Sequence, residues 1–259
     1  MAEFLIRRFG DEGWEEAEDV VAGEEPLQIT LDGVPVAVVM RTAGDDGDLV
    51  RGFLVTENLV KSLEEVGRVD LEAKENHALV FLKEGVEFDA GRLQRNLFSA
   101  SSCGICGKAS IDSIRQEYGR VGAGFEVAKD VLFAMPERLR GVQRVFAETG
   151  GLHAAALVSA AGEVLVLRED VGRHNAIDKV IGWGLAGGVE FGEVFLQVSG
   201  RVSFEVMQKA LAVGIPLVAA ISAPTSLAVE FARESGQTLV GFLREPRMNV
   251  YSFSERVLG

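Results

Sequence analysis

The chain is poor in cysteine and histidine, with two of the first and three of the second among 259 residues. A structural zinc site needs four ligands, so two cysteines would leave two positions for His77, His153 and His174. No two of these histidines stand at ligand spacing from one another. The sequence therefore argues against a zinc site, and we expect no metal.

Long apolar runs and an excess of basic residues are also missing. No run approaches the roughly 20 apolar residues that span a membrane, and the first residues lack the basic-then-apolar pattern of a secretory signal. Lys and Arg number 26 against 39 Asp and Glu, which gives a net charge of −13. A surface of this charge repels phosphate backbones. We expect a cytoplasmic protein that binds neither nucleic acid nor membrane.

Cys103 and Cys106 both lie in residues 101–108, Ser-Ser-Cys-Gly-Ile-Cys-Gly-Lys. Free cysteine is usually buried among apolar neighbours, whereas glycine and serine are typical of a loop that reaches solvent. A helix is predicted directly after this loop, over residues 109–115. The helix dipole and Lys108 favour the thiolate over the thiol. Because the thiolate is the nucleophile, the motif predicts sulfur chemistry.

Other interpretations of the cysteine pair stay open. A structural disulfide across so short a loop would constrain little and suits an oxidising compartment. A thioredoxin-like redox pair follows an early strand of a βαβ unit, and the charged, glycine-rich residues before this pair fit that context poorly. Two functional alternatives to a nucleophile or sulfur carrier are a cofactor-binding chaperone without sulfur transfer and a redox or metal-binding regulator.

The N-terminal part predicts a small α+β unit. Strands at residues 27–31 and 34–40 flank Asp32-Gly33, which is a tight hairpin signal. A helix through residues 49–55 and strands at 66–71 and 78–82 follow.

From about residue 150, strands alternate with helices. Apolar runs predict strands at residues 154–158, 164–167, 194–198, 217–221 and 238–243, and helices are predicted at 175–185, 204–212 and 226–233. Such alternation implies crossover connections and a parallel sheet covered on both faces, while the first two strands form a hairpin. The expected fold class is α/β, with a mixed, mostly parallel sheet.

Ligands bind beyond the carboxyl ends of the strands in such a sheet. The turns expected there are residues 168–175, 199–203 and 222–225, and each opens a helix with free N–H groups suited to an anion. Arg173 and Arg201 add positive charge. The plainer interpretation is that Ser203 and Thr225 are helix caps and that His174 is a scaffold residue. A zinc deaminase is disfavoured, because His174-Asn175-Ala176 lacks the glutamate of His-x-Glu.

Four motifs occur in one order along the chain. They are residues 103–108, residues 169–179 (Glu-Asp-Val-Gly-Arg-His-Asn-Ala-Ile-Asp-Lys), Ser199-Gly200-Arg201, and residues 222–228. With them the chain resembles the formate dehydrogenase accessory sulfurtransferases, the FdhD family, from about residue 25 to residue 251. One departure is Ala43 after Thr42, where the family usually has proline.

The resemblance implies a sulfurtransferase that takes sulfur from a cysteine desulfurase as a cysteine persulfide. Its acceptor would be the molybdenum cofactor, bis-molybdopterin guanine dinucleotide, before that cofactor enters formate dehydrogenase. The first cysteine, Cys103, would carry the persulfide and Cys106 would assist. The resemblance also implies a homodimer and a cytidine-deaminase-like core. The expected domains are residues 1–125, ending in the cysteine loop, and residues 126–259.

The last expected site is the segment after the final strand, which resembles the cofactor-binding segment of the family. Arg244 and Arg247 suit phosphate, Phe242 offers a face for a purine, and Glu245 suits the guanine edge. The predicted cofactor-binding residues are Phe242, Leu243, Arg244, Glu245, Pro246 and Arg247.

Overall fold

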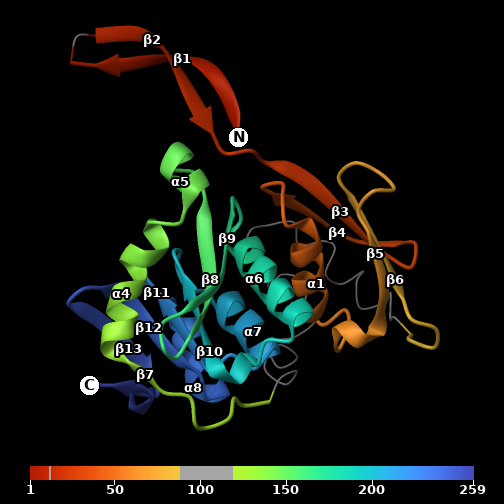
Figure 1. Cartoon of the computed structure of the whole chain (residues 1–259), viewed down its shortest axis with the longest axis vertical. Helices are drawn as coiled ribbons and strands as arrows, with labels where there is room; N and C mark the ends of the chain where they lie inside the picture. Colours follow the sequence, from red (N-terminus) through yellow and green to blue (C-terminus); the bar gives the residue numbers. More distant parts are fainter. Residues whose placement is uncertain (12, 88–118) are drawn as a thin grey trace.

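The computed structural model describes residues 1–11, 13–87 and 119–259. Its largest element is a six-stranded sheet in the order β13-β12-β11-β10-β8-β9 (Figure 1). The strands are β8 (His153–Ser159), β9 (Val164–Asp170), β10 (Val194–Val198), β11 (Leu217–Ala220), β12 (Thr238–Arg244) and β13 (Arg247–Ser252). The expected α/β class is confirmed.

Parallel pairing is confined to the middle of this sheet. Strand β11 runs parallel to β10 and to β12. Strands β8 and β10, β8 and β9, and β12 and β13 pair antiparallel. The sheet is therefore mixed, and the expectation that it is mostly parallel needs correction. A crossover helix makes the next strand parallel, whereas short turns fold β9 onto β8 and β13 onto β12.

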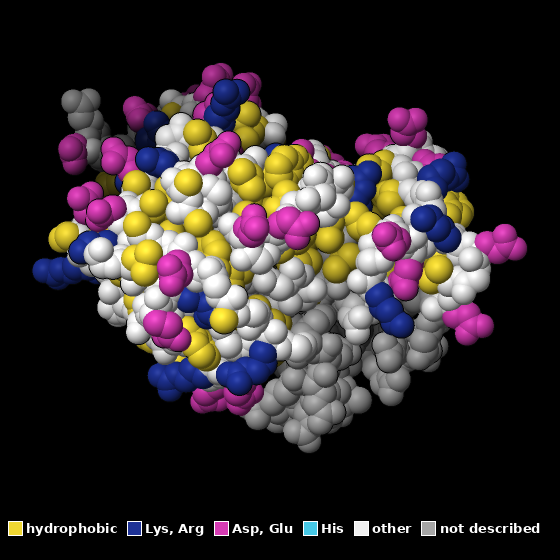
Figure 2. All heavy atoms as spheres, turned by 60° about the horizontal axis from the view of Figure 1, so that its bottom comes forward, with side chains coloured by type: hydrophobic (Ala, Val, Ile, Leu, Met, Phe, Trp, Pro, Cys, Tyr) yellow, Lys and Arg dark blue, Asp and Glu magenta, His cyan; other side chains and the backbone are white. Residues whose placement is uncertain are grey.

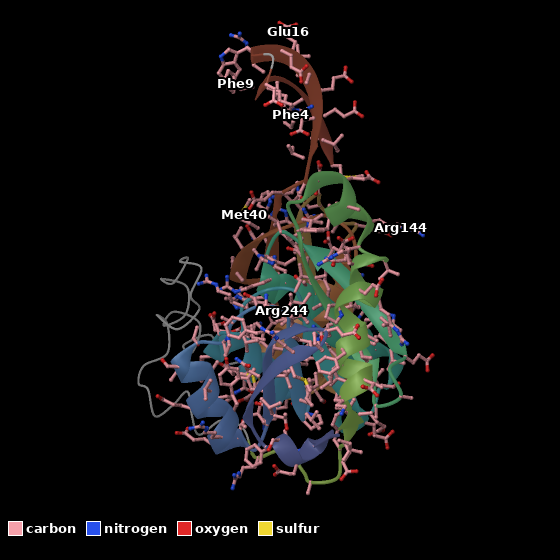
Figure 3. All side chains as sticks on the ribbon, turned by 90° about the vertical axis from the view of Figure 1, so that its left-hand side faces the viewer. Phe4, Phe9, Glu16, Met40, Arg144 and Arg244 are labelled. Carbon is pink, nitrogen blue, oxygen red and sulfur yellow. The ribbon has the colours of Figure 1, made fainter. Side chains whose placement is uncertain are left out.

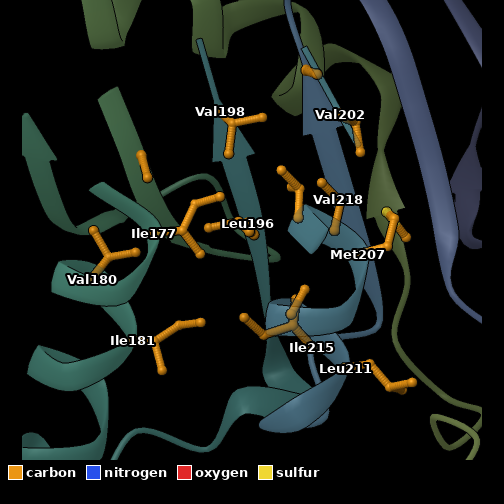
Figure 4. Close-up of a cluster of buried hydrophobic side chains, with 14 of the residues drawn as sticks. Ile177, Val180, Ile181, Leu196, Val198, Val202, Met207, Leu211, Ile215 and Val218 are labelled. Carbon is orange, nitrogen blue, oxygen red and sulfur yellow. The ribbon is translucent and has the colours of Figure 1, made fainter. Parts of the chain in front are cut away.

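Helices cover both faces of the sheet. One face packs against α6 (Arg173–Gly187), α7 (Phe204–Ala212) and α8 (Ser226–Ser235). Figure 4 shows part of this layer, where Ile177 and Met207 from the helices lie over Leu196 and Val218 of the sheet. The other face packs against α4 (Lys129–Arg140), which is followed by α5 (Arg144–Thr149).

A smaller sheet with its own core precedes this part of the chain. Its order is β4-β3-β6-β5, and α1 (Asp46–Thr56) shares its core. The strands are β3 (Glu25–Leu31), β4 (Val34–Arg41), β5 (Val66–Asp70) and β6 (His77–Leu82). Asp32 and Gly33 have φ values of 45° and 83°, so the predicted tight turn between β3 and β4 is confirmed.

Helices α1 and α6 approach each other through two glycines. A Cβ on Gly52 would overlap the main-chain oxygen of Asp178 and lie 2.6 Å from its carbonyl carbon. A Cβ on Gly182 would likewise overlap the main-chain oxygen of Asp48. Hydrogen at both positions lets the two backbones touch, which joins the core of the small sheet to the large one.

Further elements lie outside the predicted pattern. Strands β1 (Ala2–Gly10) and β2 (Gly13–Val21) form a separate hairpin that projects from the body (Figure 1). Val121 donates its main-chain N–H to Ser235, and Phe125 packs in the core under α4, so residues before 126 contact the larger sheet unit. The short elements are β7 (Val127–Ala128), β14 (Val257–Leu258), η1 (Leu63–Glu65), η3 (Phe191–Glu193) and η4 (Ser254–Arg256).

Candidate functional site at the carboxyl edge of the large sheet

The predicted sulfur site lies outside the described residues. Cys103, Cys106 and Lys108 all fall within residues 88–118, which lie outside the described part of the chain. Their roles stay predictions from the sequence.

The three predicted turns lie at one edge of the large sheet. His174 Nε2 of the first turn lies 3.4 Å from Ser203 Oγ of the second, and main-chain hydrogen bonds join the second turn to the third. The N–H of Val202 donates to Ala223 (3.1 Å), and the N–H of Thr225 donates to Val202 (2.9 Å). The N–H of Phe242 donates to the carbonyl of Ser222 (3.1 Å). This edge therefore forms one connected surface, as the strand pattern predicted.

Three side chains of the motif at residues 169–179 bind the N-terminal unit. They are Asp170, Asn175 and Lys179, and we call them the clamp. Asp170 is fully buried, and its Oδ2 lies 2.8 Å from Lys179 Nζ and 3.2 Å from the donating N–H of Thr42. Its Oδ1 accepts from Gly172 N (2.8 Å) and Asn175 Nδ2 (2.9 Å). Asn175 also donates to the carbonyl of Met40 (2.7 Å). These contacts are structural, because donors from the protein already satisfy both carboxylate oxygens of Asp170.

A second buried cluster joins α1, α6 and α7. Lys209 Nζ lies 2.9 Å from Asp178 Oδ2 and 2.7 Å from Glu57 Oε1, and it donates to Thr56 Oγ1 (2.9 Å). Burial raises the pKa of Asp178 to about 6, although Lys209 opposes the shift. Burial by itself would lower the pKa of Lys209, but the carboxylates of Asp178 and Glu57 outweigh it and raise that pKa. Removing one partner would leave a buried charge uncompensated.

His174, on the first turn of α6, is held neutral. Burial, together with the positive charges of Lys209 and Arg173, lowers its pKa to about 3, although Glu57 opposes the shift. Its Nε2 lies 3.2 Å from Glu205 Oε2 and 3.4 Å from Ser203 Oγ. Because a carboxylate only accepts hydrogen bonds, the proton belongs on Nε2, and Nδ1 is left as an acceptor.

Arg173 places a positive charge at the same edge. Its Nε is buried and has no hydrogen-bond partner among residues 1–11, 13–87 and 119–259. His153, at the start of β8, has a pKa lowered by burial and then by Arg173. A Cβ at Gly200 would lie 3.4 Å from His153 Nδ1, which is ordinary van der Waals contact, so this turn passes beside the imidazole. One arginine beside two neutral histidines suits an anionic ligand.

The two expected helix caps differ. Thr225 Oγ1 accepts from Ala228 N (3.3 Å), as a cap does. The Ser203 side chain makes no cap bond to α7 and lies beside His174 instead. The α6 N-terminus, at Gly172, also has no side-chain cap. The N-terminal ends of α6 and α7 therefore keep main-chain N–H groups that can donate to a ligand.

The predicted cofactor-binding segment forms the turn between β12 and β13. Arg244 and Arg247 are exposed, stand opposite each other, and have no ion pair with any residue that the structure describes. Phe242 is 39% exposed with a φ of 51°, Glu245 is exposed, and the Glu245–Pro246 peptide is cis. Leu243 is fully buried in the core under α4, so its side chain is a core side chain and only its main chain is left for a ligand.

Several residues of this sheet edge and of the two buried clusters were not identified as site residues from the sequence. They are Thr42, Glu57, His153, Lys209 and Glu205. Lys209 carried a usable signal, because a lysine inside the apolar helix over residues 204–212 requires a buried acidic partner. Thr42 carried none, since its contact with Asp170 spans 128 residues of sequence.

Within the described ranges, no group of three or more His, Cys, Asp or Glu side chains is arranged to hold a metal ion. No helix there is long and apolar enough to cross a membrane. On the face shown in Figure 2, acidic and basic side chains are interspersed.

The family model and the curated relatives that match this chain both carry the name FdhD. The model of the FdhD/NarQ family matches residues 22–258. A sulfur carrier protein FdhD of Mycobacterium tuberculosis is 47% identical over 253 residues, covering 92% of each chain. One of Sulfolobus acidocaldarius is 43% identical over 242 residues, covering 93% of this chain and 92% of the other.

A solved structure shares the fold. It is the crystal structure of a protein assigned as a formate dehydrogenase accessory protein from Desulfotalea psychrophila. Its TM-score is 0.81 at 23% sequence identity, with 99% of each chain covered.

Proposed function

The chain belongs to the FdhD/NarQ family, and on that premise we propose that it is a sulfur carrier acting in the cytoplasm. It would take sulfur from a cysteine desulfurase and deliver it to the molybdenum cofactor, bis-molybdopterin guanine dinucleotide, before the cofactor enters formate dehydrogenase. The cofactor is the substrate of this reaction. The activity is that of a sulfurtransferase.

The proposed transfer conserves atoms and electrons. The Cys103 thiolate attacks the outer sulfur of the donor's persulfide, and the donor leaves as a thiolate while Cys103 becomes the persulfide. Cys106 then attacks the inner sulfur at Cys103. A Cys103–Cys106 disulfide forms, the outer sulfur leaves as hydrosulfide for the metal, and an external thiol later reduces the disulfide.

One observation carries this proposal. The chain has no other thiols than Cys103 and Cys106, and proteins up to 47% identical over almost the full chain are named sulfur carriers. A protein with that role needs a nucleophilic sulfur, so the chemistry has to use this pair.

Incubation with a cysteine desulfurase and free cysteine should add the mass of one sulfur atom to the chain. Peptide mapping should locate the added sulfur on Cys103, the first cysteine of the pair, which is the position that the resemblance to the family assigns to the persulfide. Intact-protein mass spectrometry before and after treatment with a reducing thiol provides the measurement. An unmodified chain, beside a desulfurase that persulfidates a known acceptor, would favour the chaperone without sulfur transfer.

The guanine dinucleotide end of the substrate is proposed to bind at residues 242–247. Arg244 and Arg247 are exposed and adjacent across the turn, which suits two phosphate groups. Phe242 presents part of its ring, and the exposed Glu245 can accept hydrogen bonds from guanine. Arg173, whose Nε has no hydrogen-bond partner among the described residues, offers a further contact for an anion at the same sheet edge.

Isothermal calorimetry with GDP tests this site. The Arg244→Ala, Arg247→Ala double variant should bind GDP at least about tenfold more weakly, because each charge-assisted contact contributes on the order of 1.5–3 kcal/mol. The matched control is Arg140→Ala, Arg144→Ala, which removes the same charge from exposed residues of α4 and α5. Figure 3 shows Arg144 and Arg244 on different parts of the molecule. Equal GDP affinity in both double variants would contradict this site and would indicate that GDP binds at the turns that hold Arg173 and Arg201.

A further inference from the structure

Strand β9 is the last strand of the large sheet, and its outer edge has no neighbouring strand in the described chain. It lies beside α6 (Figure 1). Within the described residues, Val164–Leu167 form main-chain hydrogen bonds only as part of the β8–β9 pair. These four residues are Val-Leu-Val-Leu and carry no charge. An apolar edge with unpaired main-chain N–H and C=O groups is a template for another strand.

A groove of about 600 Å³ runs along this edge. It is lined by Val164–Arg168 of β9, by Arg138 of α4, by Val142 just after α4, and by Trp183 of α6. We call it the β9 groove. Its five β9 residues span about 13 Å at the rise of a β-strand. The groove therefore has the length of an extended segment of about five residues.

Two arginines bind the main chain at the two ends of the β9 groove. Arg138 Nη1 donates to the carbonyl of Gly162 (2.9 Å), just before β9, and Arg168 Nη1 donates to the carbonyl of Leu167 (3.2 Å). The charge of Arg168 is balanced, because its Nη2 lies 3.0 Å from Asp48 Oδ2. Arg138 is exposed and forms no ion pair with any residue that the structure describes. An unbalanced positive charge therefore lies at the Gly162 end.

The lining determines which chemistry an occupant must have. Side chains alternate along a strand, so an added strand would present one set toward Trp183 and the other toward Val142. Both sets must be apolar, as in a strand that is buried on two faces. A carboxylate fits beside Arg138, where it gains a charge-assisted contact. The lining holds two arginines and no acidic side chain, so the groove of a second copy is not complementary to it.

We propose that the β9 groove binds an extended segment of a partner protein, which adds to β9 as an antiparallel strand. The segment is a continuous apolar run that ends in Glu or Asp. In the antiparallel direction its C-terminal end lies at Gly162, because Gly162 precedes β9, and the acidic residue then pairs with Arg138. Main-chain hydrogen bonds supply the affinity, and the side-chain contacts supply the specificity.

The position of this groove separates it from the candidate site for the cofactor. Strand β9 is at one end of the large sheet, and β13, which begins at Arg247, is at the other. A partner segment on β9 therefore leaves residues 242–247 exposed, and one copy of the chain can hold both ligands.

Fluorescence anisotropy with a labelled synthetic peptide tests the docking on the full chain. The probe is Gly-Ser-Val-Ile-Val-Val-Glu, and the matched peptide ends in lysine instead of glutamate. The chain should bind the glutamate peptide at least about tenfold more tightly, because only its carboxylate pairs with Arg138. A glutamate peptide methylated on alternate main-chain nitrogens should lose binding, since it cannot donate to the β9 edge.

Variants of one helix locate the contact. Arg138→Glu should weaken binding of the glutamate peptide by about tenfold or more, whereas Arg138→Lys keeps the charge and should retain most of the affinity. The matched control is Arg140→Glu, because Arg140 is exposed on the same helix and does not line the groove. Circular dichroism of the three variants shows whether each one is folded.

Hydrogen exchange and light scattering complete the test. Bound peptide should slow amide exchange at residues 164–167, because their outer main-chain groups become paired. Preference for the glutamate peptide, loss of binding in Arg138→Glu alone, and slowed exchange in β9 support the proposal. No binding, equal binding of both peptides, binding unchanged by main-chain methylation, or equal effects of Arg138→Glu and Arg140→Glu overturn it. A lower mass of Arg138→Glu in solution also overturns it, because a second copy would then occupy the groove. Sulfur transfer plays no part in these readouts.

Discussion

Replacing Gly52 with alanine should lower the free energy of unfolding by about 3 kcal/mol or more. The added methyl group would overlap the main-chain oxygen of Asp178, and main chain at a helix crossing cannot rotate away as a side chain can. The helices must separate instead. That movement also pulls on Thr56 and Asp178, which share the buried cluster around Lys209. Thermal unfolding followed by circular dichroism should show a melting temperature lowered by about 6–12 °C.

Gly187→Ala is the matched control for this prediction. Gly187 ends α6, the same helix that holds Gly182, and a Cβ there meets nothing within 4 Å. Alanine is favoured over glycine in helices by up to about 1 kcal/mol, so this variant should be neutral or slightly more stable. If Gly52→Ala and Gly187→Ala melted at the same temperature, the close approach of α1 and α6 would be wrong.

Replacing Cys103 with alanine should reduce activation of a formate dehydrogenase client to the level seen without the protein. Under the proposed mechanism, the Cys103 sulfur holds the transferred sulfur, whereas Cys106 only displaces it as hydrosulfide. Cys106→Ala should still accept sulfur but release it slowly, because the thiol that displaces hydrosulfide is gone. Formate oxidation by the client, matured with each variant, is the measurement.

Thermal unfolding separates a chemical from a structural role for these cysteines. Both variants should melt close to the unsubstituted chain if the cysteines act through their thiols. Full activation by Cys103→Ala together with loss of activation by Cys106→Ala would reverse the two assignments. Full activation by both variants would contradict sulfur transfer through the pair.

Local patterns located most elements of the larger unit. Strand β10 and helix α7 have the predicted bounds, residues 194–198 and 204–212. A continuous apolar run and an apolar face with helical spacing are properties of neighbouring residues, so sequence alone reveals them. The same holds for the turn at Asp32-Gly33. The family motifs, read in order, then indicated the FdhD family.

Other features depended on residues that are distant in sequence. The predicted hairpin of β8 and β9 is confirmed, but the antiparallel pairing of β10 with β8 joins strands that β9 and α6 separate along the chain. Helix α4 and the hairpin β1–β2 were missed. Strands β1 and β2 mix charged and apolar residues and pack against no core of the described chain, so they lack the apolar pattern that reveals a strand in the sequence.

The sequence by itself determined the class of the fold, the position of the cysteine pair, and the meeting of three turns at one sheet edge. Only the tertiary structure decided that Asp170 and Lys179 form a buried clamp around Thr42, and that Lys209 pairs with Asp178 and Glu57. The tertiary structure also decided that the Leu243 side chain is buried in the core and that Arg244 is exposed. The physical reason is that a buried charge is tolerated only where folding brings an opposite charge to it, and that partner can lie anywhere along the chain.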